Sequence, residues 1–244
     1  MSETNEPQRS LSAAEPTSEL RRISIHENGE PLVDFMELCP ALCWVSRHPV
    51  FDYERFRLLR RTPTEMLACA QERLPQGIRL AVVEGWRPPE IQRRMHEETR
   101  ARLRREHPEW SDRHLAREAN RFSAPMDRRV PPPHTTGGAV DVHLVDEAGE
   151  ILDFISPYDL MDRRGAPRDA RGLSPEARRN RKLLQEVMEA AGLTNYPSEW
   201  WHWSYGDQGW AYRGRHPRAV YGATEPPDLA GRDFTLHPRK EPGW

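Results

Sequence analysis

The chain has 244 residues, enough for one sizeable hydrophobic core or for one domain with short extensions. Hydrophobic residues make up 36% of the sequence and charged residues 30%, a composition typical of a polar globular protein. Because 36 Lys and Arg residues are balanced by 38 Asp and Glu residues, the net charge of −2 argues against binding to nucleic acid or to an anionic membrane through bulk charge.

The first 20 residues are rich in Ser, Glu, Pro and Thr and predict a disordered tail. They contain no apolar stretch like the core of a signal peptide, and no later window approaches the length of a transmembrane helix. The three cysteines, Cys39, Cys43 and Cys69, cannot all pair with one another, which fits a reducing compartment. We therefore expect a cytoplasmic protein with no membrane segment.

The first regular elements are predicted between residues 62 and 122. TPTEMLACAQERL (residues 62–74) begins with a capping Thr and carries Pro and Glu in its first turn, which predicts a helix. IRLAVVEG (residues 78–85) predicts a short apolar strand that ends at Gly85, and Pro88 and Pro89 force an extended exit. The charged sequence over residues 90–122 predicts two solvated helices separated by Pro108, with opposite charges three and four residues apart.

VPPPHTTGGAVDVHLVD (residues 130–146) predicts a turn followed by a strand that begins at Ala139. Along a strand, successive side chains point to opposite faces, so Asp141 and His143 share one face and the apolar residues share the other. A carboxylate on a half-buried strand needs a partner, because an unpaired buried charge is costly. A metal ion would be one such partner.

The remaining elements are predicted as follows. ILDFISPYDLMD (residues 151–162) indicates a short strand followed by a loop, and residues 174–193 predict a helix that Ser174 caps and Gly192 ends. SEWWHWSYG (residues 198–206) predicts a further strand because of its aromatic residues. The Pro-rich and Arg-rich sequence beyond Tyr212 predicts loop or tail.

The residue types needed for metal-dependent hydrolysis occur in two of these segments. A catalytic zinc typically has three protein ligands and an open position for water, while a nearby carboxylate takes the proton of that water. His134, Asp141, His202 and Glu199 supply two imidazoles, one ligating carboxylate and one spare carboxylate. His143 competes with His134 for the ligand role, because it shares a strand face with Asp141. Residues three apart point to opposite sides of a regular strand, so Glu199 and His202 converge only if Glu199 lies in a turn or bulge before the strand.

Four motifs in this order and spacing resemble one family. They are EGWRP (residues 84–88), HTTGGAVDV (134–142), LDFISPYDLMD (152–162) and EWWHW (199–203). The chain resembles the zinc-dependent D-alanyl-D-alanine dipeptidases of the vancomycin-resistance type, which are related to cell-wall D,D-carboxypeptidases and to the hedgehog signalling domain. The resemblance runs from about Leu80 to Tyr212. It implies an α+β fold, with a mainly antiparallel sheet and flanking helices.

Carried over residue by residue, the resemblance implies one Zn2+ per chain with the ligands His134, Asp141 and His202. It implies that Glu199 is the general base and acid, and that Arg87 binds the scissile carbonyl oxygen and stabilises the oxyanion. The departures from the family pattern at the motif around Arg87 are mild, because the family usually has Asp where Glu84 stands and Tyr where Trp86 stands.

The resemblance also implies that Asp159 holds the free ammonium of the dipeptide substrate. We therefore expect a metallopeptidase that hydrolyses D-Ala-D-Ala or a related small dipeptide, with a metal-bound water as the nucleophile and a role in peptidoglycan metabolism. The alternatives are a cell-wall D,D-carboxypeptidase or endopeptidase and a zinc-containing binding domain without catalysis. The expected organisation is a tail over residues 1–20, one zinc dipeptidase domain over 21–213 and a C-terminal extension over 214–244. The expected partner is the small dipeptide, with no nucleic acid and no membrane, and the sequence leaves the oligomeric state open.

Overall fold

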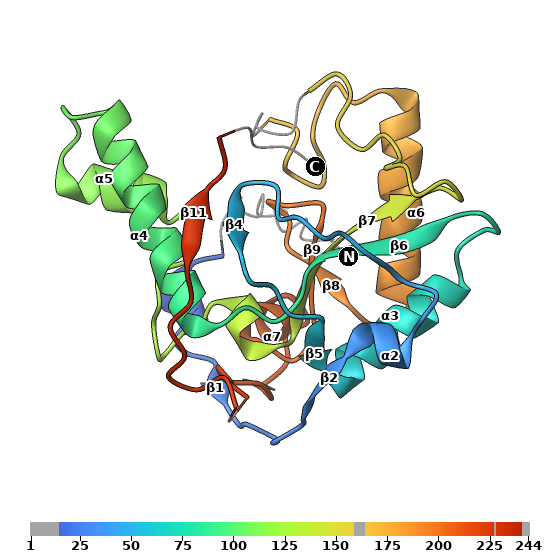
Figure 1. Cartoon of the computed structure of the whole chain (residues 1–244), viewed down its shortest axis with the longest axis horizontal. Coiled ribbons are helices and arrows are strands. Elements are labelled where there is room, and N and C mark those ends of the chain that lie inside the picture. Colours follow the sequence, from blue (N-terminus) through green and yellow to red (C-terminus); the bar gives the residue numbers. More distant parts are fainter. Residues whose placement is uncertain (1–14, 159–163, 227, 241–244) are drawn as a thin grey trace, which may run out of the picture.

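A computed structural model describes residues 15–158, 164–226 and 228–240 of the chain (Figure 1). Its centre is a five-stranded sheet in the order β3-β6-β7-β9-β8. The strands are β3 (Cys43–Trp44), β6 (Arg79–Glu84), β7 (Ala139–Val145), β9 (His202–Ser204) and β8 (Thr194–Asn195). β3 and β6 are parallel, and the other three pairs are antiparallel. The expected α+β fold with a mainly antiparallel sheet is therefore confirmed.

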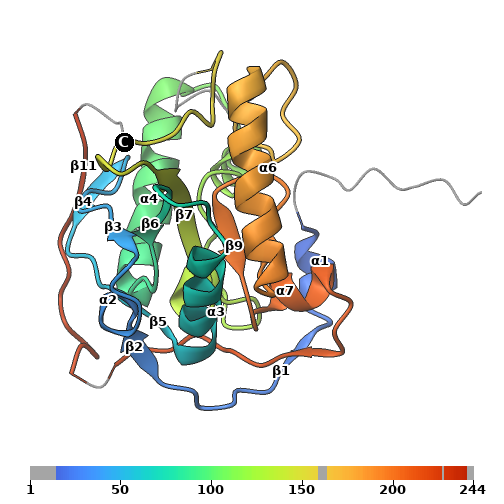
Figure 2. The same cartoon turned by 90° about the vertical axis from the view of Figure 1, so that its right-hand side faces the viewer.

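Helices α3 (Arg61–Glu72) and α6 (Pro175–Ala190) contact each other beside the sheet, as Figures 1 and 2 show from two directions. α6 begins and ends where local sequence signals predict, whereas α3 begins at Arg61, before the Thr62 that was expected to cap it, and its N-cap residue Arg60 makes no side-chain capping bond. In α6 the Ser174 hydroxyl accepts a hydrogen bond from the Ala177 amide at 3.0 Å, and Gly192 takes a φ of +97° after the last turn. Buried apolar side chains from these helices and from the sheet form the main core: Leu67, Ala70, Leu80, Val82, Val140, Val142, Leu144, Leu184, Val187 and Met188.

On the opposite side of the molecule, α4 (Pro89–Glu106) and α5 (Asp112–Ala119) form a pair of helices that projects from the body (Figure 1). They contact each other through a small apolar cluster of Leu103, Leu115 and Ala119. The two helices predicted on either side of Pro108 are confirmed. Ser111 caps the second helix by accepting from the His114 amide at 3.3 Å.

The smaller elements surround this body. They are α1 (Thr17–Leu20), β1 (Ser24–Ile25), β2 (Leu32–Asp34), α2 (Phe35–Leu38), β4 (Phe51–Tyr53), β5 (Leu58–Arg60), the 3-10 helix η1 (Pro133–Thr136), α7 (Gln208–Arg213), β10 (Arg218–Ala219) and β11 (Leu236–Pro238). β2 pairs with β5, and the two form a separate small sheet next to the N-terminus of α3.

Two predicted strands differ from the structure. The strand expected at the start of residues 151–162 is a single bridge between Ile151 and Val145, because the Asp153 carboxylate accepts from the Ile155 and Ser156 amides and turns the chain there. The strand expected over residues 198–206 begins only at His202, because the preceding residues form a turn.

The chain ends also differ from expectation where they are described. Residues 1–14 of the predicted tail lie outside the described residues, but Thr17–Leu20 form the short helix α1. The C-terminal sequence predicted as loop or tail contributes two strands: β10 pairs in parallel with β1, and β11 pairs antiparallel with β4. Such pairing between distant segments leaves no local signal in the sequence. Across the described part of the chain, every helix is too short or too polar to span a bilayer.

Candidate metal centre

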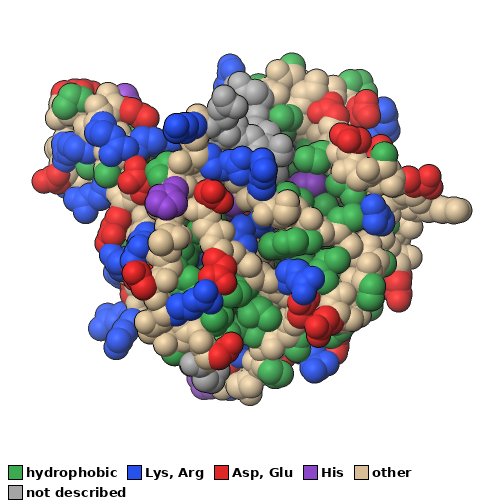
Figure 3. Space-filling model, in the orientation of Figure 1, with side chains coloured by type: hydrophobic (Ala, Val, Ile, Leu, Met, Phe, Trp, Pro, Cys, Tyr) green, Lys and Arg blue, Asp and Glu red, His purple; other side chains and the backbone are tan. Residues whose placement is uncertain are grey.

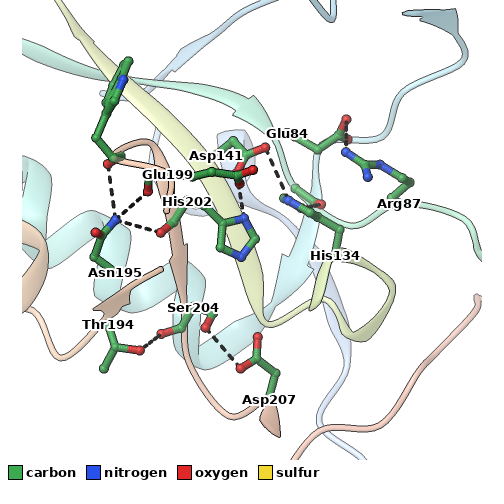
Figure 4. Close-up of polar contacts among 12 residues, drawn as sticks. Glu84, Arg87, His134, Asp141, Thr194, Asn195, Glu199, His202, Ser204 and Asp207 are labelled. Atoms are coloured by element: carbon green, nitrogen blue, oxygen red, sulfur yellow. Dashed lines mark hydrogen bonds and ion pairs between the residues drawn. The ribbon is translucent and has the colours of Figure 1, made fainter. Parts of the chain in front are cut away.

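His134, Asp141 and His202 each direct one potential ligand atom into a common point, and these atoms all lie within 4.8 Å of one another (Figure 4). His134 comes from η1, Asp141 from β7 and His202 from β9. The three side chains are only 8%, 13% and 9% exposed, respectively. The space-filling view in Figure 3 shows a hollow between β4 and β9, with histidine and basic side chains visible at its floor.

The sheet register sets the position of two members of the cluster. Asp141 on β7 is the direct cross-strand partner of His202 on β9, and Glu84 at the end of β6 is opposite Asp141 on the other side. Directly opposite residues in an antiparallel pair have their side chains close together on one face. The pairing of three distant segments therefore brings Glu84, Asp141 and His202 together.

A tight turn sets the position of His134. Gly137 has a φ of +71°, and a Cβ there would lie 2.5 Å from a Leu32 methyl carbon. A Cβ on Gly138 would lie 2.3 Å from the carbonyl oxygen of Tyr205. The two glycines therefore allow η1 to pass directly into β7, which places His134 over Asp141 on the same side of the sheet.

The donor atoms fit a divalent metal ion. His134 donates from Nδ1 to the Gly85 carbonyl oxygen at 2.9 Å, which leaves its Nε2 lone pair facing Asp141 Oδ2 at 3.3 Å. His202 Nδ1 lies 2.9 Å from Asp141 Oδ1. Ligand atoms in a tetrahedral zinc site, with bonds of about 2.0–2.1 Å, lie about 3.3 Å apart, and each imidazole is close to that distance from one of the two Asp141 oxygens. Two imidazoles and one carboxylate are a donor set that zinc accepts.

The charges within the cluster reinforce one another. Burial alone would raise the pKa of Asp141, but the charges and hydrogen bonds of His134 and His202 outweigh it and lower that pKa. Burial alone would lower the pKa of His202, but the hydrogen bond and the charge of Asp141, together with the charge of Glu199, raise it. Asp141 is therefore ionised, and its negative charge favours positive charge beside it.

Glu199 lies in the turn that precedes β9, as its convergence with His202 requires. Its amide donates to the Tyr196 carbonyl oxygen at 2.9 Å, and its own carbonyl oxygen accepts from the His202 amide at 3.2 Å. Figure 4 shows the Glu199 side chain reaching from this turn toward Asp141 and His202. The turn thus brings a half-buried second carboxylate to the metal cluster.

The Asn195 side chain holds this turn. Its Nδ2 group donates to the carbonyl oxygens of Glu199 at 3.0 Å, Trp200 at 3.3 Å and His202 at 2.9 Å. Asn195 was not among the residues predicted from the sequence. The signal available was a buried-strand Asn a few residues before an aromatic run, a residue type that often hydrogen-bonds the backbone of turns.

Arg87 and Glu84 lie on the His134 side of the cluster, whereas Glu199 lies on the other side (Figure 4). The Arg87 amide donates to the His134 carbonyl oxygen at 3.1 Å, and its guanidinium donates to Glu84 Oε2 at 3.3 Å and to Gln92 Oε1 at 2.7 Å. The Tyr53 hydroxyl donates to the same Glu84 oxygen. Burial would raise the pKa of Glu84, but the charges of Arg87 and other cations lower it, so Glu84 is an ionised anchor for the guanidinium.

Sequence reasoning also missed Gln92 and Tyr53 as partners of this arginine and its anchor. Gln92 lies in the first turn of α4, which begins at Pro89, and this places its side chain beside Arg87. A polar residue three positions after a helix-starting proline was the available signal.

Two residues considered from the sequence are not part of the described cluster. Asp159 is outside the described residues, so its predicted role in holding the ammonium group stays a prediction. Among the described residues, the cluster contains His134 and does not contain His143. His143 is 1% exposed, and burial lowers its pKa to about 4, so it is neutral at pH 7.

Comparisons with known proteins agree on one family. The sequence profile of the D-Ala-D-Ala dipeptidase family matches residues 48–220. The chain is 39% identical over 112 residues to a D-alanyl-D-alanine dipeptidase of Synechocystis, covering 39% of this chain and 45% of that one. It is 39% identical over 77 residues to the Escherichia coli D-alanyl-D-alanine dipeptidase, covering 32% and 39% of the two chains. These alignments span less than half the length of the curated relatives.

Two solved structures are similar at low sequence identity. The LdcB LD-carboxypeptidase is 18% identical with a TM-score of 0.42, covering 79% of this chain and 77% of that chain. The vancomycin-resistance D,D-pentapeptidase VanY, solved in complex with Zn(II), is 15% identical with a TM-score of 0.41, covering 81% of this chain and 94% of that chain.

Proposed function

Since the chain belongs to the D-Ala-D-Ala dipeptidase family, we propose that it hydrolyses D-Ala-D-Ala or a related small dipeptide with the help of a zinc ion. The observation that carries this proposal is the convergence of His134, Asp141 and His202 with a second carboxylate, Glu199, beside them. A structural zinc site uses four protein ligands, whereas three ligands with an adjacent carboxylate suit a catalytic one.

His134, Asp141 and His202 would hold the metal. A zinc ion at this position would lower the pKa of a bound water to about 7 and polarise the scissile carbonyl group. The hydrogen bond from His134 Nδ1 to the Gly85 carbonyl oxygen fixes the tautomer that ligates through Nε2. Gly85 and Arg87 lie two residues apart in the sequence. The same loop therefore orients the proposed ligand His134 and carries the arginine that would stabilise the oxyanion.

Glu199 would act as general base and then as general acid. Its carboxylate would accept a proton from the attacking water and pass it to the nitrogen of the departing D-alanine. The turn tied by Asn195 supports this role, because it keeps Glu199 beside the cluster without making it a ligand.

Arg87 would stabilise the negative charge that develops on the scissile carbonyl oxygen. A guanidinium acts most strongly when it is fixed in place and shielded from water before the reaction begins. Glu84 and Gln92 fix Arg87 in this way, and its side chain is only 10% exposed. Burial would lower the pKa of Arg87, but Glu84 raises it, so the side chain is charged throughout the working pH range.

Asp159 would complete the substrate site by holding the free ammonium of the dipeptide. A carboxylate in this role would select substrates with an unblocked amino terminus. N-acetylation of D-Ala-D-Ala should therefore abolish cleavage, and Asp159→Asn should raise KM more than it lowers kcat.

The experiment that tests the proposal is the release of free D-alanine from D-Ala-D-Ala by the zinc-loaded protein, with Glu199→Ala and Glu199→Gln as variants. Wild-type release and a loss of at least about 100-fold in both variants, with zinc still bound, would support the reaction and the role of Glu199. Preferential cleavage of D-Ala-terminated pentapeptides would instead support a D,D-carboxypeptidase. Zinc binding with no cleavage of either substrate would contradict the proposal.

A further inference from the structure

The C-terminal segment that follows the family-matched region runs back across the molecule to the candidate site. We call residues 221–226 and 228–240 the C-terminal strap; they lie beyond residue 220, where the family match ends. Figure 2 shows the strap passing from the side of α7 and β1 to β11, which lies beside β4 at the opposite edge. The strap therefore connects two sides of the region that carries Arg87 and His134.

The backbone of Thr224 bridges the two segments that carry these residues. Its amide donates to the carbonyl oxygen of Thr135 at 2.9 Å, and its carbonyl oxygen accepts from Trp86 Nε1 at 2.9 Å. Thr135 directly follows His134, and Trp86 directly precedes Arg87. The Arg87 amide and the His134 carbonyl oxygen are joined by a hydrogen bond. Thr224 thus binds the residue next to each of these two, Trp86 beside Arg87 and Thr135 beside His134.

The strap also surrounds the Trp86 side chain. Trp86 is fully buried in an apolar cluster that includes Leu229 and Phe234 from the strap. Phe56 makes edge-on contacts with both Trp86 and Phe234, with ring centroids 5.5 Å and 5.9 Å apart. The indole ring is therefore fixed by packing as well as by its hydrogen bond.

A second connection reaches Arg87 through β4. In the β11–β4 pair, Leu236 of the strap is opposite Tyr53, whose hydroxyl donates to the Glu84 carboxylate that accepts from Arg87. The strap also forms ion pairs at 2.6 Å between Asp233 and Arg94 and at 2.8 Å between Arg232 and Glu54. Both pairs are exposed and contribute little on their own, so the pairing and packing carry the connection.

We propose that the C-terminal strap is a positioning element that fixes Arg87 relative to His134, and that Trp86 and Thr224 transmit this effect. The inference rests on the proposed function, in which Arg87 stabilises the oxyanion. Displacement of a catalytic group by about 1 Å can lower a rate about 100-fold. The strap therefore supports the reaction by keeping the Arg87 guanidinium in place. Asp141 and His202 have their own support from the β7–β9 register, and His134 is also held by the turn at Gly137 and Gly138 and by its hydrogen bond to the Gly85 carbonyl oxygen.

Two variants test the proposal in different ways. Trp86→Phe removes the Nε1 donor and keeps an aromatic ring, whereas Thr224→Pro removes the amide donor. Thr224→Ala is the matched control, because it keeps both backbone groups. We expect Trp86→Phe and Thr224→Pro to lower kcat by about 10-fold or more with KM changed less than about 2-fold and with bound zinc unchanged. Thr224→Ala should match the wild type.

A double-mutant cycle separates positioning from general destabilisation. In an Arg87→Ala background, Trp86→Phe should cause no further loss of kcat, because the group that it positions is already absent. Multiplicative losses in the double variant would overturn the inference and leave the proposed function intact. If the wild-type protein cleaves no dipeptide, the proposed function fails. The positioning of Arg87 by the strap then needs a test that uses no substrate.

Amide hydrogen exchange supplies that substrate-independent test. Exchange at the Arg87 amide should be about 10-fold faster in Thr224→Pro and Trp86→Phe than in Thr224→Ala, because loss of the bridge permits local opening. Exchange in β7 should stay unchanged. Equal exchange at Arg87 in all three variants would overturn the proposal, as would acceleration throughout the sheet.

Discussion

Asp141 and His202 are directly opposite each other in the β7–β9 pair, and Asp141 Oδ1 lies 2.9 Å from His202 Nδ1. The contact is thus fixed by the sheet itself and does not depend on a flexible loop. Asp141 Oδ2 faces His134 at 3.3 Å, so one carboxylate joins both imidazoles.

This arrangement predicts that Asp141→Asn abolishes tight zinc binding. The amide keeps the size of the side chain but removes the charge that balances the metal, so zinc affinity should fall by more than about 100-fold. Titration against a competing chelator measures the change. Asp169→Asn is the control, since Asp169 is 82% exposed and lies outside the cluster. Zinc binding by Asp141→Asn equal to that of the control would exclude Asp141 as a ligand.

His134 and His143 both suit the ligand role from the sequence alone, and their replacement by alanine should give opposite results. His134→Ala should lose bound zinc, because it removes one of the three donors. His143→Ala should retain zinc, although it should lower the free energy of unfolding because His143 is buried. Metal content after dialysis and the denaturant midpoint together distinguish the two. Loss of zinc from His143→Ala with a folded chain would contradict the ligand set.

The buried imidazole of His48 should make the free energy of unfolding depend on pH. Burial lowers its pKa to about 3, and its Nδ1 accepts from the Val50 and Phe51 amides at 3.1 Å, contacts that a protonated ring cannot make. In the unfolded chain the pKa is about 6.5, so the unfolded state binds more protons between pH 6.5 and 3. The stability from this group is complete above pH 6.5 and is lost as the pH falls toward 3, by at most about 1.4 kcal/mol per pH unit.

His48→Asn is the informative variant. The Asn carbonyl oxygen can accept from the same two amides but does not titrate in this range. Urea unfolding at pH 7, 6 and 5 should therefore show a shallower loss of stability in the variant than in the wild type. Parallel pH profiles for the two proteins would show that His48 does not titrate on unfolding.

The sequence predicts best those elements whose boundary signals are local. Ser174 followed by Pro175 begins α6, and Gly192 follows its end, because capping and chain reversal depend only on adjacent residues. The turn at Glu199 was deducible for a similar reason, since strand periodicity requires it if Glu199 and His202 are to converge. The mixture of helices and strands was predicted from local patterns, and the topology came from the family resemblance that the four ordered motifs carry.

Local sequence patterns did not predict the contacts between distant segments. The pairing of β11 with β4 and the bridge made by Thr224 join residues far apart in sequence, and nothing near Thr224 marks it as a backbone partner of Trp86. The strand expected at Ile151 also depended on its surroundings, because the Asp153 carboxylate turns the chain after a single bridge. Periodicity indicates which face of a segment is apolar but not which segment covers it.

Asn195 supplies the last prediction, because it separates the position of Glu199 from the binding of the metal. Its Nδ2 group donates to three carbonyl oxygens of the turn that carries Glu199, at 2.9–3.3 Å. Asn195→Leu keeps the approximate volume and removes these donors, which leaves the Glu199 and His202 carbonyl oxygens with only their backbone partners, the His202 and Tyr196 amides. The free energy of unfolding should fall by about 1–3 kcal/mol.

The same variant should lower kcat more than it lowers zinc affinity. The turn sets where the Glu199 carboxylate lies, whereas the proposed ligand His202 is also held by its pairing with Asp141 across the sheet. Thr194→Val is the matched control: it removes a neighbouring hydroxyl that donates to the Ser204 carbonyl oxygen and accepts from the Arg213 guanidinium, and it leaves the Asn195 bonds to the turn in place. Steady-state kinetics and chelator titration of the two variants provide the comparison. Equal losses of kcat in both variants would show that Asn195 supports the fold in general and does not position Glu199.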